Sequence, residues 1–258
     1  MVDYGDAMTE VLTAAPTAPT WTAVARSRTH ELVLQRIEEQ IVAGNLRVGD
    51  RLPAERDLAA QLGVSRSSIR EAVRILEAQG VLTSGVGSGP DAGTVVTALP
   101  AEALTRVLRL HLALSSFDLA EMVEARVTLE RSSARLAARD ATHDDLAELT
   151  RLLAAMDQPE VTREAFHALD TDFHVALARA SHNRLVREMT TALRNSLAGA
   201  ISDVLAGTDD WDAVRTGLHA DHLAIDAAVR AGDPEAAATA VEGHIREFAV
   251  RLLTPREG

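Results

Sequence analysis

The segment at residues 52–80 constrains the fold of this chain more than any other, because it encodes two short helices around a tight turn. The spacing of its apolar residues predicts a first helix at residues 53–62, with Gly63 after it as a helix stop. Ser65 then predicts the N-cap of a second helix at residues 66–80. On that second helix one stripe holds Ile69, Val73 and Leu76, and another holds Arg66, Arg70 and Arg74.

A helix with one apolar face, one arginine face and a hydroxyl-rich N-terminus suits the major groove of DNA. The apolar face packs on its own domain, while arginine forks reach guanine edges or phosphates and serine hydroxyls reach phosphates. The alternative is a surface helix with three solvated arginines, and this helix alone does not separate the two. The preceding helix and turn, and the segment that follows, favour DNA binding.

The residues on either side of these two helices complete a small domain. Residues 29–43 predict an amphipathic helix. Residues 81–83 and 94–97 predict two short strands, and the glycine-rich residues 85–93 predict the turn between them. Three helices followed by a β-hairpin make a winged helix-turn-helix, which we place at residues 25–98.

From Pro100 onward the sequence pattern is helical to the end of the chain. Alanine and leucine dominate, and the alternation that is typical of strands is absent. The expected helices cover about 101–115, 118–139, 143–156, 162–181, 183–206, 210–231 and 234–253. We therefore expect a mainly α protein whose residues 99–258 form an all-α domain of six or seven helices, arranged as a bundle.

Composition narrows the class of protein further. The chain has no cysteine, which excludes disulfides and thiolate metal sites. No apolar run approaches the roughly 20 residues that cross a bilayer, and the N-terminus lacks a signal-peptide pattern. We therefore expect a cytoplasmic protein without a membrane partner, and a disordered tail at residues 1–24. The net charge is −12, but residues 26–98 carry nine arginines and nine acidic residues, so the acidity lies elsewhere and does not exclude DNA binding.

Four side chains in the helical domain have the spacing of a metal site. Asp170 and His174 are four residues apart, so on one helix they share a face, with Cβ atoms ~5–6 Å apart. His222 and His244 each lie eleven residues from Asp233, at the predicted turn between the last two helices. In an antiparallel hairpin these positions lie level, ~16 Å from the turn. Three imidazoles and one carboxylate suit Zn²⁺ first, with Ni²⁺ or Mn²⁺ as alternatives.

The pattern of histidines leaves several roles open. Interior histidines are often satisfied by hydrogen bonds alone, without a metal. A bound ion with an open coordination position could hold a carboxylate ligand, could activate water as in a metallohydrolase, or could serve only as a structural staple. Arg126 could form a fork with the carboxylate of such a ligand, or it could form an internal salt bridge with Glu130. We find no partnered general base beside the ligands, which favours ligand binding over catalysis.

The chain resembles the GntR family of transcriptional regulators, and within it the FadR-like subfamily, whose effector-binding domain is called FCD. The resemblance rests on GNLRVGDRLPAERDLAAQLGVSRSSIREAVRILEAQGVL, EARVTLERSSARLAARDAT, LDTDFHVALARASHNRLV and DHLAIDAAVRAGDPEAAATAVEGHIREF, which cover most of residues 28–250. It implies DNA contacts by Arg56, Ser65, Arg66, Ser67, Ser68 and Arg70. It implies metal ligation by Asp170, His174, His222 and His244, and effector contacts by Arg126 and Asn183.

The same resemblance implies partners and a function. Family members are usually homodimers that bind palindromic operators in double-stranded DNA, and their effectors are commonly small organic acids. We therefore expect a transcriptional regulator, not an enzyme, whose operator affinity is controlled by a small carboxylate bound at the metal. One feature departs from the family, because the expected wing tip contains Asp91 but no arginine or lysine. The backbone N–H groups of Gly87 and Gly89 are the expected phosphate contacts in its place.

Overall fold

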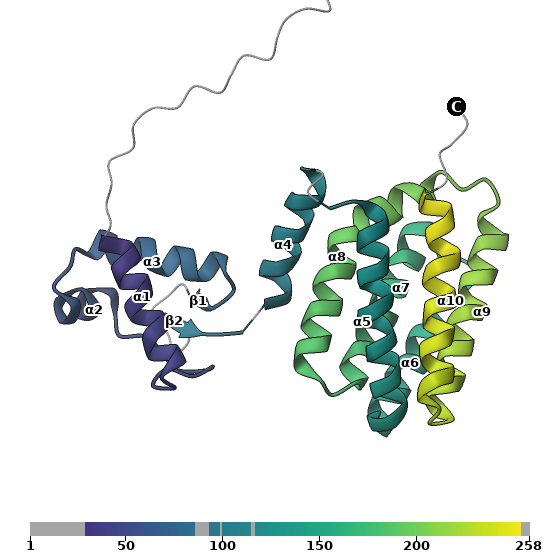
Figure 1. Cartoon of the computed structure of the whole chain (residues 1–258), viewed down its shortest axis with the longest axis horizontal. Coiled ribbons are helices and arrows are strands. Elements are labelled where there is room, and N and C mark those ends of the chain that lie inside the picture. Colours follow the sequence, from purple (N-terminus) through teal and green to yellow (C-terminus); the bar gives the residue numbers. More distant parts are fainter. Residues whose placement is uncertain (1–28, 86–92, 99, 115–116, 254–258) are drawn as a thin grey trace, which may run out of the picture.

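The computed structural model describes residues 29–85, 93–98, 100–114 and 117–253. It consists of two parts joined by one helix (Figure 1). The N-terminal part contains α1 (Thr29–Val42), α2 (Glu55–Leu62), α3 (Arg66–Ala78), β1 (Leu82–Gly85) and β2 (Gly93–Val96). The C-terminal part contains α5 (Leu119–Asp140), α6 (His143–Met156), α7 (Arg163–Ala180), α8 (Arg184–Ala206), α9 (Trp211–Arg230) and α10 (Pro234–Leu253), and α4 (Pro100–Ala113) lies between the two parts. The predicted tail at residues 1–24 lies outside the described residues.

The three N-terminal helices pack around one apolar core, and the β-hairpin closes it. The core contains Val33, Ile37, Leu58, Ile69, Val73, Leu76, Leu82 and Val96. The strands β1 and β2 pair in antiparallel register, with Leu82 opposite Val96. Arg51 forms an isolated bridge with Val95, which ties the loop before α2 to the hairpin. The predicted winged helix-turn-helix is therefore confirmed.

Local backbone geometry explains where the helices of this part begin and end. The helix α2 begins at Glu55, later than predicted, because Ala54 keeps an extended conformation with ψ 144°. Gly63 adopts φ 66°, the left-handed conformation that ends a helix at little cost to glycine. The helix α3 ends at Ala78, before its predicted end, because Gly80 has already turned to φ 71°.

The seven predicted C-terminal helices are present as α4–α10, each end within two residues of its expected place. Two of them begin with a full capping box. Asp118 accepts a hydrogen bond from the N–H of Glu121 at 2.7 Å. Thr142 accepts one from the N–H of Asp145 at 3.3 Å. These side chains satisfy backbone donors that the helices would otherwise leave unpaired.

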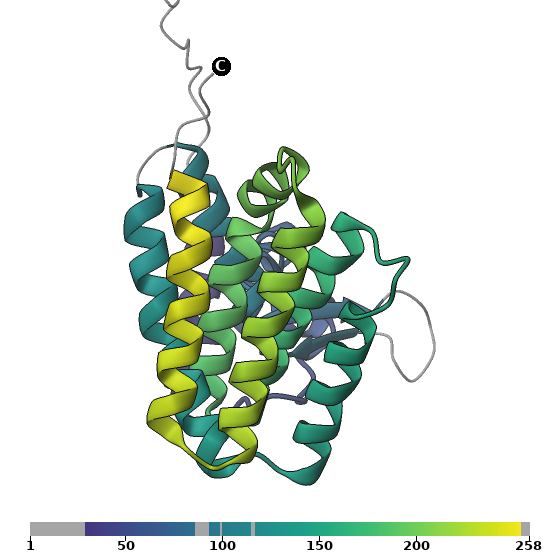
Figure 2. The same cartoon turned by 90° about the vertical axis from the view of Figure 1, so that its right-hand side faces the viewer.

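The helix α5 lies at the centre of the bundle and packs against α7, α8, α9 and α10. Figure 2 shows this bundle from the side, with α10 in yellow and α9 beside it. Phe166 and Phe173 of α7 are fully buried between the helices. No helix in the described part of the chain is long and apolar enough to cross a membrane.

The helix α4 contacts both parts of the molecule. It packs along α8, where Oγ1 of Thr105 lies 3.3 Å from the carbonyl oxygen of Ala192. At the next residue, Nη2 of Arg106 donates a hydrogen bond to the carbonyl oxygen of Ala78, at the C-terminus of α3. The distance between the two atoms is 2.7 Å. The helix α4 therefore contacts both α8 and the C-terminus of α3.

Candidate functional site

The N-terminus of α3 carries the serines that the sequence predicted as DNA contacts. Oγ of Ser65 accepts a hydrogen bond from the N–H of Ser68 at 3.2 Å and lies 2.8 Å from Oγ of Ser67. Ser68 is buried, and its hydroxyl lies 3.0 Å from that of Ser65. Ser65 is therefore the N-cap of α3, and the hydroxyl of Ser68 is buried against it, so the predicted DNA contact of Ser68 has the least geometric support of the three.

The predicted DNA-contacting arginines all extend into solvent. The side chains of Arg66 and Arg70 are 63% and 55% exposed, and Arg56 is 81% exposed. Glu55 lies 3.8 Å from Arg66 and 3.9 Å from Arg70. Exposed ion pairs of this kind contribute about 0–1 kcal/mol to stability. The contact with Glu55 is therefore weak enough for the guanidinium groups to leave it. The predicted wing contacts of Gly87 and Gly89, and Asp91, lie outside the described residues.

The four predicted metal ligands meet inside the helical bundle. Asp170 and His174 project from α7, His222 from α9 and His244 from α10, and one ligand atom from each lies within 4.8 Å of the others. Nε2 of His222 lies 3.0 Å from Oδ1 of Asp170, and Nε2 of His244 lies 3.6 Å from the same atom. All four side chains are buried. The pair on one helix and the two histidines equidistant from a turn therefore form one cluster.

Three of the four groups in the cluster have the protonation state that metal ligation requires, and His244 is the exception. Burial lowers the pKa of His174 to about 3 and that of His222 to about 4, so both rings are neutral near pH 7. Burial opposes ionisation of Asp170, but the positive charge of Arg194 holds the pKa of Asp170 well below its usual value. Burial also disfavours the charged form of His244, yet hydrogen bonds with two carboxylates raise its pKa overall.

Unpaired ring nitrogens test whether these residues fit a metal ion. Both nitrogens of His174 and of His222 are buried without an aligned hydrogen-bond partner. Nδ1 of His174 lies 2.6 Å from Oε2 of Glu130, but the two atoms are not aligned as a hydrogen bond. An unpaired buried polar atom costs about 1–3 kcal/mol, and a cation that accepts the nitrogen lone pairs removes part of this cost. The donor set of three nitrogens and one oxygen fits a divalent ion such as Zn²⁺.

A buried network of four charges supports the cluster. Nη2 of Arg194 lies 2.5 Å from Oδ2 of Asp170, and its Nη1 lies 2.9 Å from Oε2 of Glu130. Nε of Arg126 donates to Oε1 of Glu130 at 2.8 Å, so the salt bridge that the sequence left open is present. The two carboxylates and the two guanidinium groups balance each other without any metal ion.

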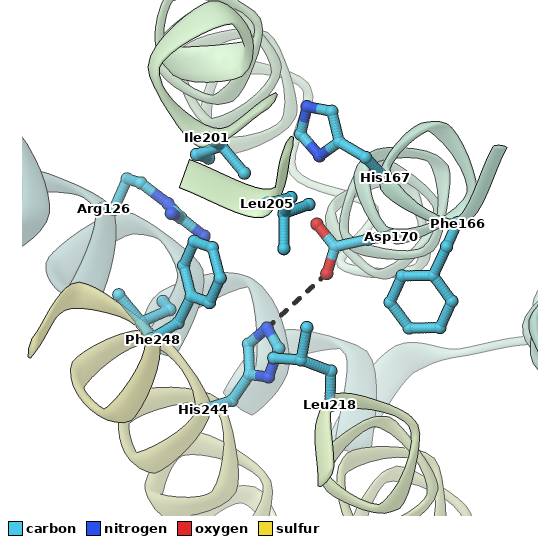
Figure 3. Close-up of a pocket in the computed structure, with 10 residues that line it drawn as sticks. Arg126, Phe166, His167, Asp170, Ile201, Leu205, Leu218, His244 and Phe248 are labelled. Carbon is cyan, nitrogen blue, oxygen red and sulfur yellow. Dashed lines mark ion pairs between the residues drawn. The ribbon is translucent and has the colours of Figure 1, made fainter. Parts of the chain in front are cut away.

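A small cavity of about 10 Å³, partly open to solvent, adjoins the cluster. Its polar walls include Arg126, His167, Asp170 and His244, and its apolar walls include Phe166, Leu205 and Phe248. Figure 3 shows Arg126 on one side of this cavity and the ion pair of Asp170 with His244 on another. Arg126 therefore lines the cavity while it holds Glu130, and the two roles that the sequence left open are compatible.

Asn183, the second predicted effector contact, lies elsewhere. Its Oδ1 accepts a hydrogen bond from the N–H of Val186 at 3.1 Å, so it caps α8. It lines a separate surface hollow with four basic neighbours. Among the described residues it does not belong to the walls of the cavity beside the metal ligands. The structure therefore does not bring Asn183 and Arg126 together, and capping explains the position of this asparagine.

Comparisons with known proteins agree with this geometry. The family model described as "Bacterial regulatory proteins, gntR family" matches residues 29–90, and the model described as "FCD domain" matches residues 121–247. An uncharacterized HTH-type transcriptional regulator of Mycobacterium tuberculosis is 32% identical over 88% of this chain and 91% of its own length. The chain belongs to the GntR family.

Further relatives of this GntR-family chain support the same conclusion. The Glc operon transcriptional activator of Escherichia coli (strain K12) is 29% identical over 84% of this chain and 85% of its own length. The solved structure of a GntR protein of Streptococcus agalactiae matches 86% of this chain and 98% of its own length, with TM-score 0.57 and 26% identity. The two sequence relatives are transcriptional regulators, not enzymes. The prediction of a DNA-binding regulator with an FCD domain is confirmed, and the metallohydrolase alternative finds no support.

Three residues of the FCD site were missed in the sequence. Arg194 gave a usable signal, because it is the only charged residue at positions 189–202 of the sequence. Asp221 precedes the candidate ligand His222 in sequence, and its Oδ2 lies 3.3 Å from Nδ1 of His244, a contact of the kind that orients a metal-binding histidine. His167 lies one helical turn before Asp170 and faces the same cavity.

Proposed function

We propose that this chain is a ligand-responsive transcriptional regulator, in which a small carboxylate effector binds beside a metal ion in the FCD domain and changes operator affinity. The ion is Zn²⁺ in this proposal, with Ni²⁺ or Mn²⁺ as alternatives. The regulator acts in the cytoplasm as a homodimer, and its two α3 helices bind the two halves of a palindromic operator. The observation that carries the proposal is the buried cluster of three histidines and one aspartate, two of whose members, Asp170 and His244, line one cavity together with Arg126.

The charges around the cavity favour an anionic effector. Asp170 and Glu130 are ionised and face Arg194 and Arg126, so the four charges cancel. A divalent ion adds two positive charges in a buried environment, where uncompensated charge is costly. When bound, the ion supplies an open coordination position for an oxygen ligand. A carboxylate that also contacts Arg126 makes a charge-assisted hydrogen bond and offsets part of the added charge.

A chain of contacts supports the link between this cavity and DNA. Arg194 of α8 holds the ligand Asp170, and α8 packs against α4 near Thr105. The next residue of α4, Arg106, donates to the carbonyl of Ala78 at the C-terminus of α3. An effector that favours one position of α8 therefore favours one position of the recognition helix. Such a ligand changes operator affinity only if it binds the two positions unequally.

Arginines and hydroxyls at the start of α3 are the proposed DNA contacts. In this proposal Arg66 and Arg70 reach base edges, and Arg56, Ser65 and Ser67 reach phosphates. The exposure of all three arginine side chains supports these roles.

An exposed apolar stripe on α4 supports the homodimer. Val107, Leu110 and Leu114 recur at helical spacing and are 54%, 61% and 67% exposed. In a homodimer, this stripe would pack against the same stripe of the second copy. Contact between identical surfaces is the usual arrangement of a two-fold interface. Sedimentation that finds only monomer at micromolar concentration would contradict this assignment.

Operator binding in the presence of organic acids tests the proposal. The experiment uses the metal-loaded full chain, an operator selected from random DNA, and fluorescence anisotropy with a panel of small carboxylates. We expect at least one acid to change operator affinity about fivefold or more, a typical allosteric coupling. The response should vanish in Asp170→Ala and persist in Asp172→Ala, which removes an exposed carboxylate two residues away. The proposal would be contradicted if no acid of the panel changed operator affinity. It would also be contradicted if Asp170→Ala responded to an acid as the wild type does.

A purely structural metal is the remaining alternative. It is favoured by the burial of the ligands, since the ion would tie α7, α9 and α10 together. Under this alternative, a chelator lowers the melting temperature while the acid response of operator binding stays unchanged. Under the proposed function, the chelator abolishes that response as well.

A further inference from the structure

Among the described residues, His167 is the one polar side chain in the wall of the cavity that belongs neither to the candidate metal cluster nor to the charge network. It lies on α7, one turn before Asp170, so the two side chains share a face of the helix. Its Nε2 lies 3.1 Å from the carbonyl oxygen of Ala198 on α8. A carbonyl oxygen only accepts hydrogen bonds, so Nε2 of His167 carries the proton of this contact.

The second nitrogen of this ring is an unpaired acceptor. In a neutral imidazole whose Nε2 is protonated, Nδ1 carries a lone pair and can only accept a hydrogen bond. Nδ1 of His167 is buried and has no partner among the described residues. In Figure 3 one ring nitrogen of His167 faces the interior of the cavity, on the side of Leu205 and Asp170. The contact with Ala198 therefore fixes the tautomer and presents an acceptor to whatever enters.

The other polar groups in the described wall of the cavity do not compete for this role. Arg126 only donates hydrogen bonds. The oxygens of Asp170 are engaged by Arg194 and by the histidines of the cluster. In this site, Arg126 and the cluster bind the carboxylate group of a ligand. A hydroxyl group on the same ligand donates its hydrogen bond to His167.

We propose that His167 is a specificity-determining residue, which selects carboxylates that bear a hydroxyl donor over the same acids without that hydroxyl. This inference rests on the proposed function, because it takes the cavity as the effector site. It differs from selection by the metal, since a hydroxyl oxygen can also coordinate an ion. Coordination of the hydroxyl by the ion would not depend on the side chain at position 167. Hydrogen bonding of the hydroxyl to Nδ1 would depend on that side chain.

Matched pairs of acids separate these causes. Calorimetry on the metal-loaded full chain compares glycolate with acetate, lactate with propanoate, and malate with succinate. For at least one pair we expect the hydroxy acid to bind about fivefold more tightly, the size of one hydrogen bond. In His167→Phe this preference should fall to twofold or less, while the affinity for the acid without the hydroxyl stays the same. In His167→Gln part of the preference should return, because an amide can donate to Ala198 and still offer an acceptor.

Metal content and melting temperature of each variant confirm that the cluster and the fold are intact. If His167→Phe and the wild type show the same preference for the hydroxy acid, the ion alone selects the hydroxyl group and the inference is overturned. If no acid of any pair binds the wild type, the proposed function fails and this inference fails with it. If acids bind but no pair shows a hydroxyl preference, only the role of His167 is lost.

The tautomer gives a readout that does not depend on any ligand. In the ¹⁵N spectrum of histidine-labelled wild-type protein near pH 7, we expect Nδ1 of His167 to have the shift of an unprotonated ring nitrogen. Assignment follows from the resonance missing in His167→Gln. A protonated Nδ1 would overturn the inference, because the nitrogen would then be a donor.

Discussion

At the scale of single residues, the FCD site depends on one guanidinium group. Arg194 lies between Asp170 and Glu130, is fully enclosed, and supplies the positive charge that keeps both carboxylates ionised. Arg126 adds a second contact to Glu130 only. Arg194 therefore sets the charge of the candidate metal ligand Asp170 from a neighbouring helix, α8.

Arg194→Met should destabilise the protein far more than the loss of an exposed arginine. Removing one partner of a buried ion pair costs about 3–5 kcal/mol, because a charge stays buried without compensation. Urea unfolding of the metal-free protein measures this loss. The control is Arg139→Met, since Arg139 is 60% exposed and pairs with Asp140 at the surface, where we expect about 0–1 kcal/mol. An equal loss of stability in the two variants would mean that the buried ion pairs stabilise the protein no more than an exposed one.

Arg66→Ala and Arg70→Ala should each weaken specific DNA binding by about 1–3 kcal/mol, the value of a good base contact. Both side chains are exposed at the start of α3, where no packing is lost by truncation. Anisotropy with the selected operator and with an unrelated duplex measures the effect on specific and on nonspecific binding. Arg139→Ala, on the FCD domain, is the control. Unchanged operator affinity in both α3 variants would remove α3 as the recognition helix.

At the scale of elements, side-chain caps decide where the helices of the bundle begin. Asp145 of α6 accepts hydrogen bonds from the N–H of Thr142 at 2.9 Å and from its hydroxyl at 2.6 Å. It also lies 3.0 Å from Nε2 of His182, beyond the end of α7. One carboxylate thus caps α6 and ties it to the segment that follows α7.

Asp145→Asn should lower stability at pH 7 by roughly 1 kcal/mol, the usual value of a cap. Burial opposes ionisation of Asp145, but hydrogen bonds from Thr142 hold its pKa below the usual value. A carboxyl with a lowered pKa stabilises the folded state above the unfolded pKa, about 3.9, and loses this effect as pH falls through the folded pKa. The difference between variant and wild type in urea unfolding should therefore shrink below about pH 4. Asp144→Asn, an exposed neighbour, should show little change, and a difference independent of pH would contradict the role of ionised Asp145.

Local spacing predicted some parts of the site and could not predict others. Helical periodicity predicts that Asp170 and His174 share one face of a helix. The symmetry of a helix hairpin predicts that His222 and His244 lie at the same height along the two helices. The contact of Arg194 with Asp170 joins two different helices, and it depends on the rotation of α8 about its axis, which no local pattern encodes. The tautomer of His167 likewise depends on a carbonyl of α8 that only packing brings near.

At the scale of the whole molecule, the described contact between the two parts lies at one end of α3. Arg106 of α4 donates to the carbonyl of Ala78, which is otherwise an unpaired acceptor at a helix C-terminus. The same helix packs along α8, which holds Arg194. Under the proposed function, binding of the effector, binding of DNA and the coupling between them therefore depend on different residues.

Arg106→Ala should therefore reduce coupling while it leaves both binding events intact. We expect the variant to bind metal, effector and operator with nearly unchanged affinity, but the change in operator affinity caused by the effector should fall toward onefold. Calorimetry measures effector binding, and anisotropy with and without the acid measures coupling. Arg109→Ala is the matched control, because Arg109 is exposed one turn further along α4. If Arg106→Ala responds to the effector as strongly as Arg109→Ala does, the signal reaches α3 by another path, and the contact with Ala78 only fixes the position of the N-terminal part.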